Sequence, residues 1–247
     1  MIISKQNQLI KQIKALSDKK ERDRSGLYIA EGVKLVKEAL SFPCRIFALI
    51  GTCDGMAKLA ETRGERVEEV SEEVFLSVST EKSPQGVMAV IYKPESFIVN
   101  EGDRCLLLDD VQDPNNVGAI IRTAAATGYN TVYLTDNCAD PYSPKSVRAT
   151  MGGIFRVNVV YADRNNLLKT IKKPLIVADM GGENIDTFRG SKEFCLVIGN
   201  EGNGVSEQIR KKAKYTVSIP MENGVESLNA AVSAGILMYQ LKNSIRR

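Results

Sequence analysis

The stretch CLLLDDVQDPNNVGAIIRTAAATG, residues 105–128, decides the fold class. Residues 105–108 form a short apolar run typical of a fully buried strand, and an acidic, Asn-rich turn follows it. From 116 to 127 the apolar residues recur at helical spacing, and Gly128 stands where a helix ends on a left-handed residue. A strand, a polar turn and a helix in this order predict one unit of parallel α/β structure.

The same alternation continues toward the C-terminus. Further strands are predicted at the short apolar runs 131–134, 157–161, 175–178, 195–198 and 216–219. Helices are predicted at 144–150, 165–172, 206–212 and 227–242. Strands that alternate with helices predict a mainly parallel sheet covered on both faces.

A smaller α/β unit is predicted upstream. An amphipathic first helix is indicated by four apolar residues at helical spacing, which are Leu9, Ile10, Ile13 and Leu16. Strands are predicted at 27–30, 45–50, 67–70 and 86–92, and helices at 33–40, after Asp54 and at 72–77. The segment KPESFIVNEGD, residues 93–103, combines Pro, Gly and charges, as linkers do. We therefore expect domains at 1–94 and 103–247, joined by a linker at 95–102.

Composition excludes several kinds of site. The chain has no histidine, so it has no Ser-His-Asp triad and no His-ligated zinc. Its five cysteines are scattered without a CxxC pair, which argues against a disulfide framework or a zinc cluster and fits a reducing cytoplasm. No run of eighteen apolar residues predicts a membrane span, and the opening MIISKQNQLIKQIK is not typical of a secretory signal.

The net charge of +3 does not by itself indicate a nucleic-acid partner, but its distribution is uneven. Residues 1–25 carry seven Lys and Arg against three Asp and Glu, a net side-chain charge of +4. A basic arm of this kind can follow a phosphate backbone, and the alternative is a solvated helix face.

The first candidate loop, residues 109–118, leads into Arg122. Asn116 can cap the helix that follows, whereas a guanidinium at the ligand end of a parallel sheet suits a phosphate. The acidic residues Asp109, Asp110 and Asp113 raise the alternative of a magnesium site. Since Asp also serves turns and caps, we favour a site without metal.

Two further loops follow strands. Residues 199–204, GNEGNG, resemble a dinucleotide fingerprint, but Glu201 replaces the middle glycine and would repel a pyrophosphate, which disfavours an NAD site. Residues 218–229, SIPMENGVESLN, enter the last helix. Ser227 can cap that helix, or the loop can leave backbone groups available to an adenine or a methionine tail.

Together, in this order, the three loops resemble the motifs of the SpoU (TrmH) family of RNA ribose methyltransferases, in the SPOUT superfamily. The matching stretches are DPNNVG with RTA (113–118, 122–124), GNEG (199–202), and IPM with SLN (219–221, 227–229). DPYSPKSVRATMG (140–152) resembles the middle segment of the family. YIAEG (28–32) and SPQGV (83–87) resemble an L30e-like substrate-binding extension. Asn115 stands where the family frequently has His, and AAVS (230–233) departs from its usual pattern.

The resemblance implies a trefoil knot in the C-terminal half, an obligate homodimer, and S-adenosylmethionine bound in a bent form. It places the cofactor against backbone groups of the second and third loops, at Gly199, Gly202, Ile219, Leu228 and Asn229. The functional polar residues of the family correspond to Asn116, Arg122, Glu201, Ser227 and Asn229.

We therefore expect methyl transfer to a ribose 2′-hydroxyl of RNA, with Glu201 orienting Arg122 and Arg122 holding the target phosphate. The L30e-like domain favours ribosomal RNA as the substrate. The alternatives are the same reaction on tRNA, a non-catalytic RNA-binding protein that retains the fold, and a nucleotide-dependent oxidoreductase.

Overall fold

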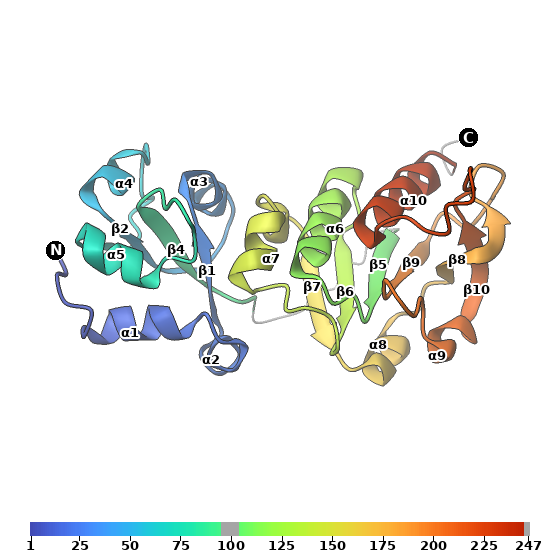
Figure 1. Cartoon of the computed structure of the whole chain (residues 1–247), viewed down its shortest axis with the longest axis horizontal. Coiled ribbons are helices and arrows are strands. Elements are labelled where there is room, and N and C mark those ends of the chain that lie inside the picture. The colour runs from blue at the N-terminus through green and yellow to red at the C-terminus, as the bar shows by residue number, and fades with distance from the viewer. Residues whose placement is uncertain (95–103, 245–247) are drawn as a thin grey trace. The chain divides into compact units, whose positions relative to one another are not determined.

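The structure is a computed structural model that describes residues 1–94 and 104–244, so the linker expected at 95–102 lies outside the described residues (Figure 1). The described residues divide into two compact units. One holds residues 1–94 and 142–155, and the other holds 104–141 and 156–244. Among the described helices, none has the length and apolar content that crossing a membrane requires.

The first unit is a four-stranded sheet with helices around it. Its strands are β1 (Leu27–Glu31), β2 (Ile46–Gly51), β3 (Val67–Glu69) and β4 (Val87–Tyr92). Their order is β1-β4-β2-β3; β4 is antiparallel to both neighbours and β3 is parallel to β2. Its helices are α1 (Gln8–Ala15), α2 (Lys19–Ser25), α3 (Val33–Ser41), α4 (Cys53–Ala57) and α5 (Glu72–Val78).

Residues 1–25 are built into this unit and do not form an arm. Ile10 and Ile13 of α1 are buried in one cluster with residues of β1, β4 and α5. Arg22 is only 3% exposed, and its guanidinium donates to the backbone carbonyls of Leu16 and Ser17 at 2.7 and 2.8 Å. Lys5, Lys19 and Arg24 form ion pairs with Glu73, Asp23 and Glu21. The basic arm predicted from charge alone is therefore wrong as a structure, although several of its lysines remain exposed.

A segment from the middle of the chain completes the first unit. Helix α7 (Pro144–Ala149) and the 3-10 turn η1 (Gly153–Phe155) follow a strand of the second unit but pack with the first. The ring of Tyr142 lies 5.0 Å from that of Tyr28, and Arg148 forms an ion pair with Glu81. This part of the family motif region thus has a structural role in the first unit.

The second unit is a six-stranded sheet in which every strand pairing is parallel. Its strands, in spatial order, are β10 (Ala213–Ser218), β8 (Leu175–Asn184), β9 (Phe194–Gly199), β5 (Arg104–Asp109), β6 (Thr131–Thr135) and β7 (Asn158–Ala162). The α/β class and the parallel sheet expected from sequence are confirmed.

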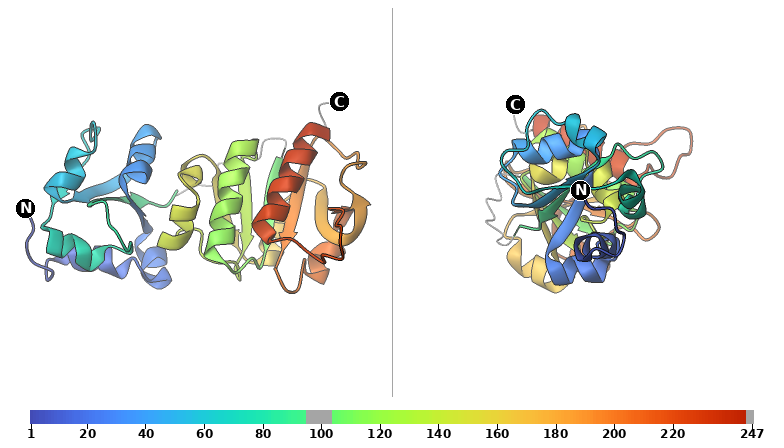
Figure 2. Two further views of the ribbon diagram at one scale, coloured as in Figure 1. Left: turned by 45° about the horizontal axis from the view of Figure 1, so that its top comes forward. Right: turned by 90° about the vertical axis from the view of Figure 1, so that its left-hand side faces the viewer.

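Helices cover both faces of this sheet, as predicted. Helices α8 (Arg164–Thr170) and α9 (Glu207–Arg210) place Leu167 and Ile209 in a cluster with inward residues of β5 and β9. On the other face α6 (Pro114–Thr127) packs beside α10 (Ala230–Ser244), as Figure 2 shows. The trefoil knot stays a prediction of the family resemblance.

Local differences from the predicted boundaries have identifiable causes. Helix α6 begins at Pro114 because Asp113 is its N-cap, accepting from the backbone N–H of Asn115, so Asn116 lies inside the helix. Strand β8 runs on to Asn184 through a glycine-rich stretch that carries no apolar pattern. Helix α2, which is almost entirely charged, was not predicted because it lacks an apolar face.

We predict that Arg22→Met lowers the free energy of unfolding by about 1–3 kcal/mol, because two carbonyl acceptors then lose their donor inside the protein. Arg24→Met is the matched control from the same helix, since Arg24 is exposed and should change stability by about 0.5 kcal/mol or less. Urea denaturation of both variants measures the difference. Equal stability of the two variants would contradict the structural role of Arg22.

Candidate active site

Two of the three candidate loops begin at neighbouring points of the second unit. Strands β5 and β9 pair in parallel with Asp109 opposite Gly199, so the first and second loops leave the same edge of the sheet side by side. The third loop follows β10 and leads into α10, which packs on α6. Parallel topology therefore gathers segments that are far apart in the chain.

One buried amide joins the three loops. Asn116, 8% exposed, donates through Nδ2 to Oε1 of Glu201 at 2.7 Å. Its Oδ1 accepts from Nδ2 of Asn229 at 3.0 Å. The structure thus brings together three of the five polar residues that the sequence assigned to function.

Asn229 also begins the last helix. Its Oδ1 accepts from the backbone N–H groups of Ala231 and Val232, at 2.9 and 3.4 Å. This is the capping role that sequence reasoning had offered to Ser227, and it explains why α10 begins three residues later than predicted. Both polar ends of the Asn229 amide are therefore engaged within the protein.

Arg122 and Ser227 lie outside this cluster. Arg122 is six residues beyond Asn116 in α6, about 9 Å along the axis and about 120° around it. Both side chains are exposed, and neither makes a hydrogen bond or ion pair with the described part of the chain. The contact expected between Glu201 and Arg122 is absent from the described residues, where Glu201 is bonded to Asn116 instead.

The second loop is closed by its own hydrogen bonds. Asn200 and Gly204 exchange backbone bonds of 3.0 and 2.9 Å, and Oδ1 of Asn200 accepts from the N–H groups of Gly202 and Asn203. A Cβ on Gly199 would lie 2.3 Å from the backbone of Gly204, so only glycine fits there. Gly199 is therefore required by this turn before any ligand binds.

The third loop leaves backbone groups available. Ile219 and Leu228 are partly buried, and within the described residues their backbone N–H and C=O groups make no hydrogen bonds. Partly buried backbone groups without partners in the protein suit a ligand that carries both donors and acceptors, as an adenine does. The loop therefore fits the cofactor role that the sequence assigned to these two residues.

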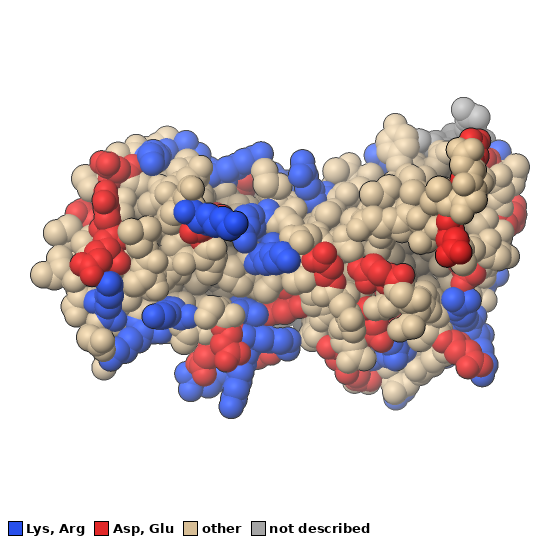
Figure 3. Space-filling model, viewed as in Figure 1, with Lys and Arg blue, Asp and Glu red and all other residues tan. Residues whose placement is uncertain are grey.

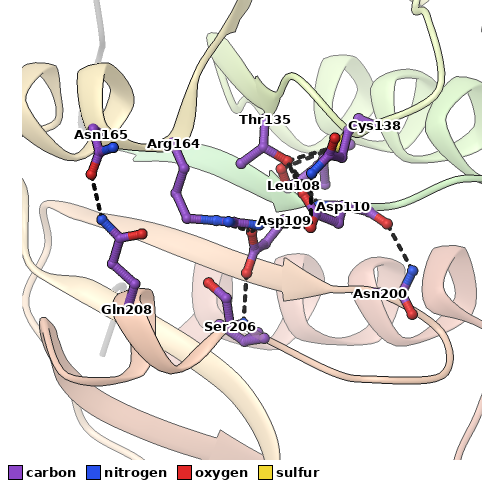
Figure 4. Close-up of polar contacts among 12 residues, drawn as sticks. Leu108, Asp109, Asp110, Thr135, Cys138, Arg164, Asn165, Asn200, Ser206 and Gln208 are labelled. Atoms are coloured by element: carbon purple, nitrogen blue, oxygen red, sulfur yellow. Dashed lines mark hydrogen bonds and ion pairs between the residues drawn. The ribbon is translucent and has the colours of Figure 1, made fainter.

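Sequence reasoning missed a set of polar contacts beneath the first two loops, drawn in Figure 4. Asp109 and Asp110 both bond to Arg164, the first residue of α8. The signal that could have found this arginine is the Asp109–Asp110 pair itself, because a buried carboxylate at a strand end needs a partner. These contacts occupy two of the three carboxylates considered for magnesium.

Comparison with known proteins agrees with this architecture. Residues 103–239 match the SpoU rRNA Methylase family, and residues 7–89 match the MRM3-like substrate binding domain. The 23S rRNA (guanosine(2553)-2′-O)-methyltransferase RlmP of Bacillus subtilis is 34% identical over 98% of both chains.

Two solved structures are similar over nearly the whole chain. The S-adenosylmethionine-bound rRNA methyltransferase of Sinorhizobium meliloti has a TM-score of 0.87 at 31% identity, covering 98% of this chain and 97% of that one. The methyltransferase AviRb of Streptomyces viridochromogenes, also in complex with that cofactor, has a TM-score of 0.85 at 27% identity, covering 98% and 99%. With three convergent loops, an all-parallel sheet and a family match over more than half its length, this chain belongs to the SpoU rRNA methylase family.

Proposed function

We propose that this protein transfers a methyl group from S-adenosylmethionine to a ribose 2′-hydroxyl of ribosomal RNA. The observation that carries the proposal is the convergence of Asn116, Glu201 and Asn229, one from each loop. Relatives that match the full length, including RlmP, are described as 23S rRNA 2′-O-methyltransferases, and two full-length structural neighbours hold the cofactor.

The cofactor would lie against the second and third loops, near Gly199, Gly202, Ile219 and Leu228. When bound, it supplies a methyl group already activated on a sulfonium, whose leaving thioether is neutral. The residues of the chain must then hold the 2′-oxygen in line with that methyl group. Alignment of this kind contributes about 7–11 kcal/mol to lowering a barrier. The hydrogen-bonded cluster centred on Asn116 supplies the rigidity, and Ser227 and Asn229 position the ribose.

Arg122 is proposed to hold the phosphate of the target nucleotide and to stabilise the developing oxyanion. Its guanidinium is exposed and is left without an ion pair by the described residues, so it is available to RNA. Action as a base is disfavoured because an arginine guanidinium in a protein stays protonated. The hydroxyl proton therefore leaves to a phosphate oxygen or to water.

The proposed assembly is a homodimer. Val232, Ile236 and Tyr239 follow one another at helical spacing on α10, and their side chains are 49%, 36% and 60% exposed. An apolar stripe of this kind is typical of a protein interface, and a second copy would bury it.

We also propose that the protein acts in a reducing cytoplasm, in keeping with its five free thiols.

Ribosomal RNA is favoured over tRNA because the match to rRNA enzymes extends over both units. A solved structure concerned with the 2-OH methylation of C/U34 on tRNA covers only 58% of this chain, with a TM-score of 0.54. The first unit also matches a substrate binding domain. In Figure 3, Lys and Arg are scattered among Asp and Glu on the part of the surface that the first unit forms.

The function is tested with purified protein, labelled S-adenosylmethionine and RNA from cells that lack the protein. Mapping of 2′-O-methyl sites should show one added site in ribosomal RNA. Modification of tRNA alone would transfer the proposal to tRNA. Tight RNA binding without cofactor binding would indicate a non-catalytic protein, and binding of NAD in place of the methyl donor would indicate an oxidoreductase.

We predict that Asn116→Asp slows single-turnover methylation by more than about tenfold, which corresponds to about 1.4 kcal/mol in the barrier. The substitution replaces a donor to Glu201 with a second carboxylate, and like charges at hydrogen-bond distance repel. Asn115→Asp is the matched control, because Asn115 is exposed and adjacent in the chain. Equal methylation rates for both variants would show that the side chain of Asn116 is not required for methyl transfer.

We predict that Arg122→Ala abolishes detectable methylation while S-adenosylmethionine affinity stays within about threefold, because Arg122 contacts RNA and not the cofactor. Calorimetry measures the affinity, and Arg189→Ala serves as an exposed arginine control in the same unit. A loss of cofactor affinity beyond about tenfold, or about 1.4 kcal/mol, would move Arg122 to a cofactor role.

The exposed lysines of the first two helices provide a separate test of RNA binding. Lys11, Lys14 and Lys20 form no ion pair with the described residues, so replacing all three with Gln should weaken RNA binding. The slope of log affinity against log salt should fall by about 0.7–0.9 for each phosphate that a lysine no longer neutralises. Lys211→Gln, which removes a surface ion pair with Glu207, is the control. An unchanged slope would indicate that these lysines lie on a solvated helix face and do not contact RNA.

A further inference from the structure

Two adjacent aspartates, Asp109 and Asp110, lie at the end of β5, where the first loop begins. Asp109 is 1% exposed, and Asp110 adopts a left-handed backbone conformation with φ of 59°. A left-handed aspartate and a buried carboxyl group are both unfavourable unless surrounding contacts stabilise them. The contacts that do so come from elements distant in sequence.

Arg164, on α8, serves both carboxylates. Its Nε donates to Oδ1 of Asp109 at 2.8 Å, and its Nη2 donates to Oδ2 of Asp110 at 2.7 Å. Burial alone would raise the pKa of Asp110, but hydrogen bonds from Thr135 and Arg164 outweigh it and hold that pKa below its usual value. One planar guanidinium therefore bonds to both carboxyl groups at once, a geometry that lysine cannot reproduce.

The same two aspartates hold the second loop at both ends. Oδ2 of Asp109 accepts from the backbone N–H of Ser206 at 2.7 Å, where the loop ends. The backbone carbonyl of Asp110 accepts from Nδ2 of Asn200 at 2.9 Å, where the loop begins. Figure 4 shows Arg164, the two aspartates, Asn200 and Ser206 converging from separate elements of one unit.

Glu201 lies between these two attachment points and reaches Asn116 in the first loop. Two sets of contacts therefore hold the first loop and the second loop together. The upper connection is the Asn116–Glu201 bond, and the lower connection consists of the bonds of Asp109 to Ser206 and of Asp110 to Asn200. The lower connection depends on residues outside the three loops, and among these Arg164 bonds to both aspartate side chains.

We propose that Arg164 is a positioning residue for methyl transfer, fixing the second loop against the first through Asp109 and Asp110. The proposal rests on the function proposed above, since it assigns the second loop to the cofactor. Arg164 does not contact the reacting groups in this scheme. Its loss leaves two neighbouring carboxylates without their cation, so the first loop shifts and the bonds to Asn200 and Ser206 loosen.

The experiment compares the full-length wild type with Arg164→Ala, Arg164→Lys and the control Arg189→Ala. Within the described residues, Arg189 bonds only to the nearby backbone carbonyls of Asp186 and Phe188. Amide hydrogen exchange over residues 199–206, without cofactor, reports the loop directly. Calorimetry reports the affinity for S-adenosylmethionine, and steady-state assays separate kcat from the KM for RNA.

For Arg164→Ala we expect exchange over 199–206 at least about tenfold faster and cofactor affinity at least about tenfold weaker, a loss that corresponds to about 1.4 kcal/mol. Affinity for RNA should stay within about twofold. Arg164→Lys should fall between Ala and wild type, because an ammonium keeps the charge but not the two-pronged contact. The control should match wild type in every measurement.

Unchanged exchange and unchanged cofactor affinity in Arg164→Ala would overturn the proposal. A fall in thermal stability with uniformly faster exchange across the unit would also overturn it, since that result describes a general structural role. If the alanine variant does not fold, Arg164→Lys decides by the same criteria. Failure of wild type to bind S-adenosylmethionine would instead overturn the proposed function, while the exchange measurement would still decide whether Arg164 holds the loop.

Discussion

The parallel pairing of β5 with β9 is the constraint on which the rest of the second unit depends. The register runs unbroken from Arg104 opposite Phe194 to Asp109 opposite Gly199. Both strands lie in the middle of the sheet, where each pairs with a neighbour on either side and helices cover both faces. Because the register is fixed, the first and second loops begin at the same height, and their short polar side chains can meet.

Asn116 suits the point where the loops meet because an amide carries a donor and an acceptor together. Glu201 offers only acceptors when ionised, and Nδ2 of Asn229 offers a donor, so the amide satisfies both without burying a charge. A separate set of contacts lies at Asp109 and Asp110, where Arg164 forms an ion pair with each. The first two loops are thus joined in two places, by the amide of Asn116 and by the contacts of the two aspartates.

The two units are not divided along the chain as the sequence motifs suggest, because a segment from the middle of the chain belongs to the first unit. Residues 140–152 resemble the middle segment of the family, yet Tyr142 and Val147 in this segment are buried and belong to the first unit. A motif can therefore mark a packing requirement and not a catalytic one. The acidic pair gives the same lesson, since carboxylates that suggest a metal are engaged by an arginine.

The sequence by itself determined the order and type of nearly all the elements, the parallel sheet, and the three loops with Asn116, Glu201 and Asn229. The elements, the sheet and the positions of the loops follow from apolar periodicity and turn chemistry, which act between near neighbours. Asn116, Glu201 and Asn229 were assigned through the family resemblance. Tertiary structure alone decided that Arg22 is buried, that Arg122 stands apart from Glu201, and that Arg164 joins Asp109. The bonds that join the loops link residues 85 and 113 positions apart, and only the strand order brings such residues together.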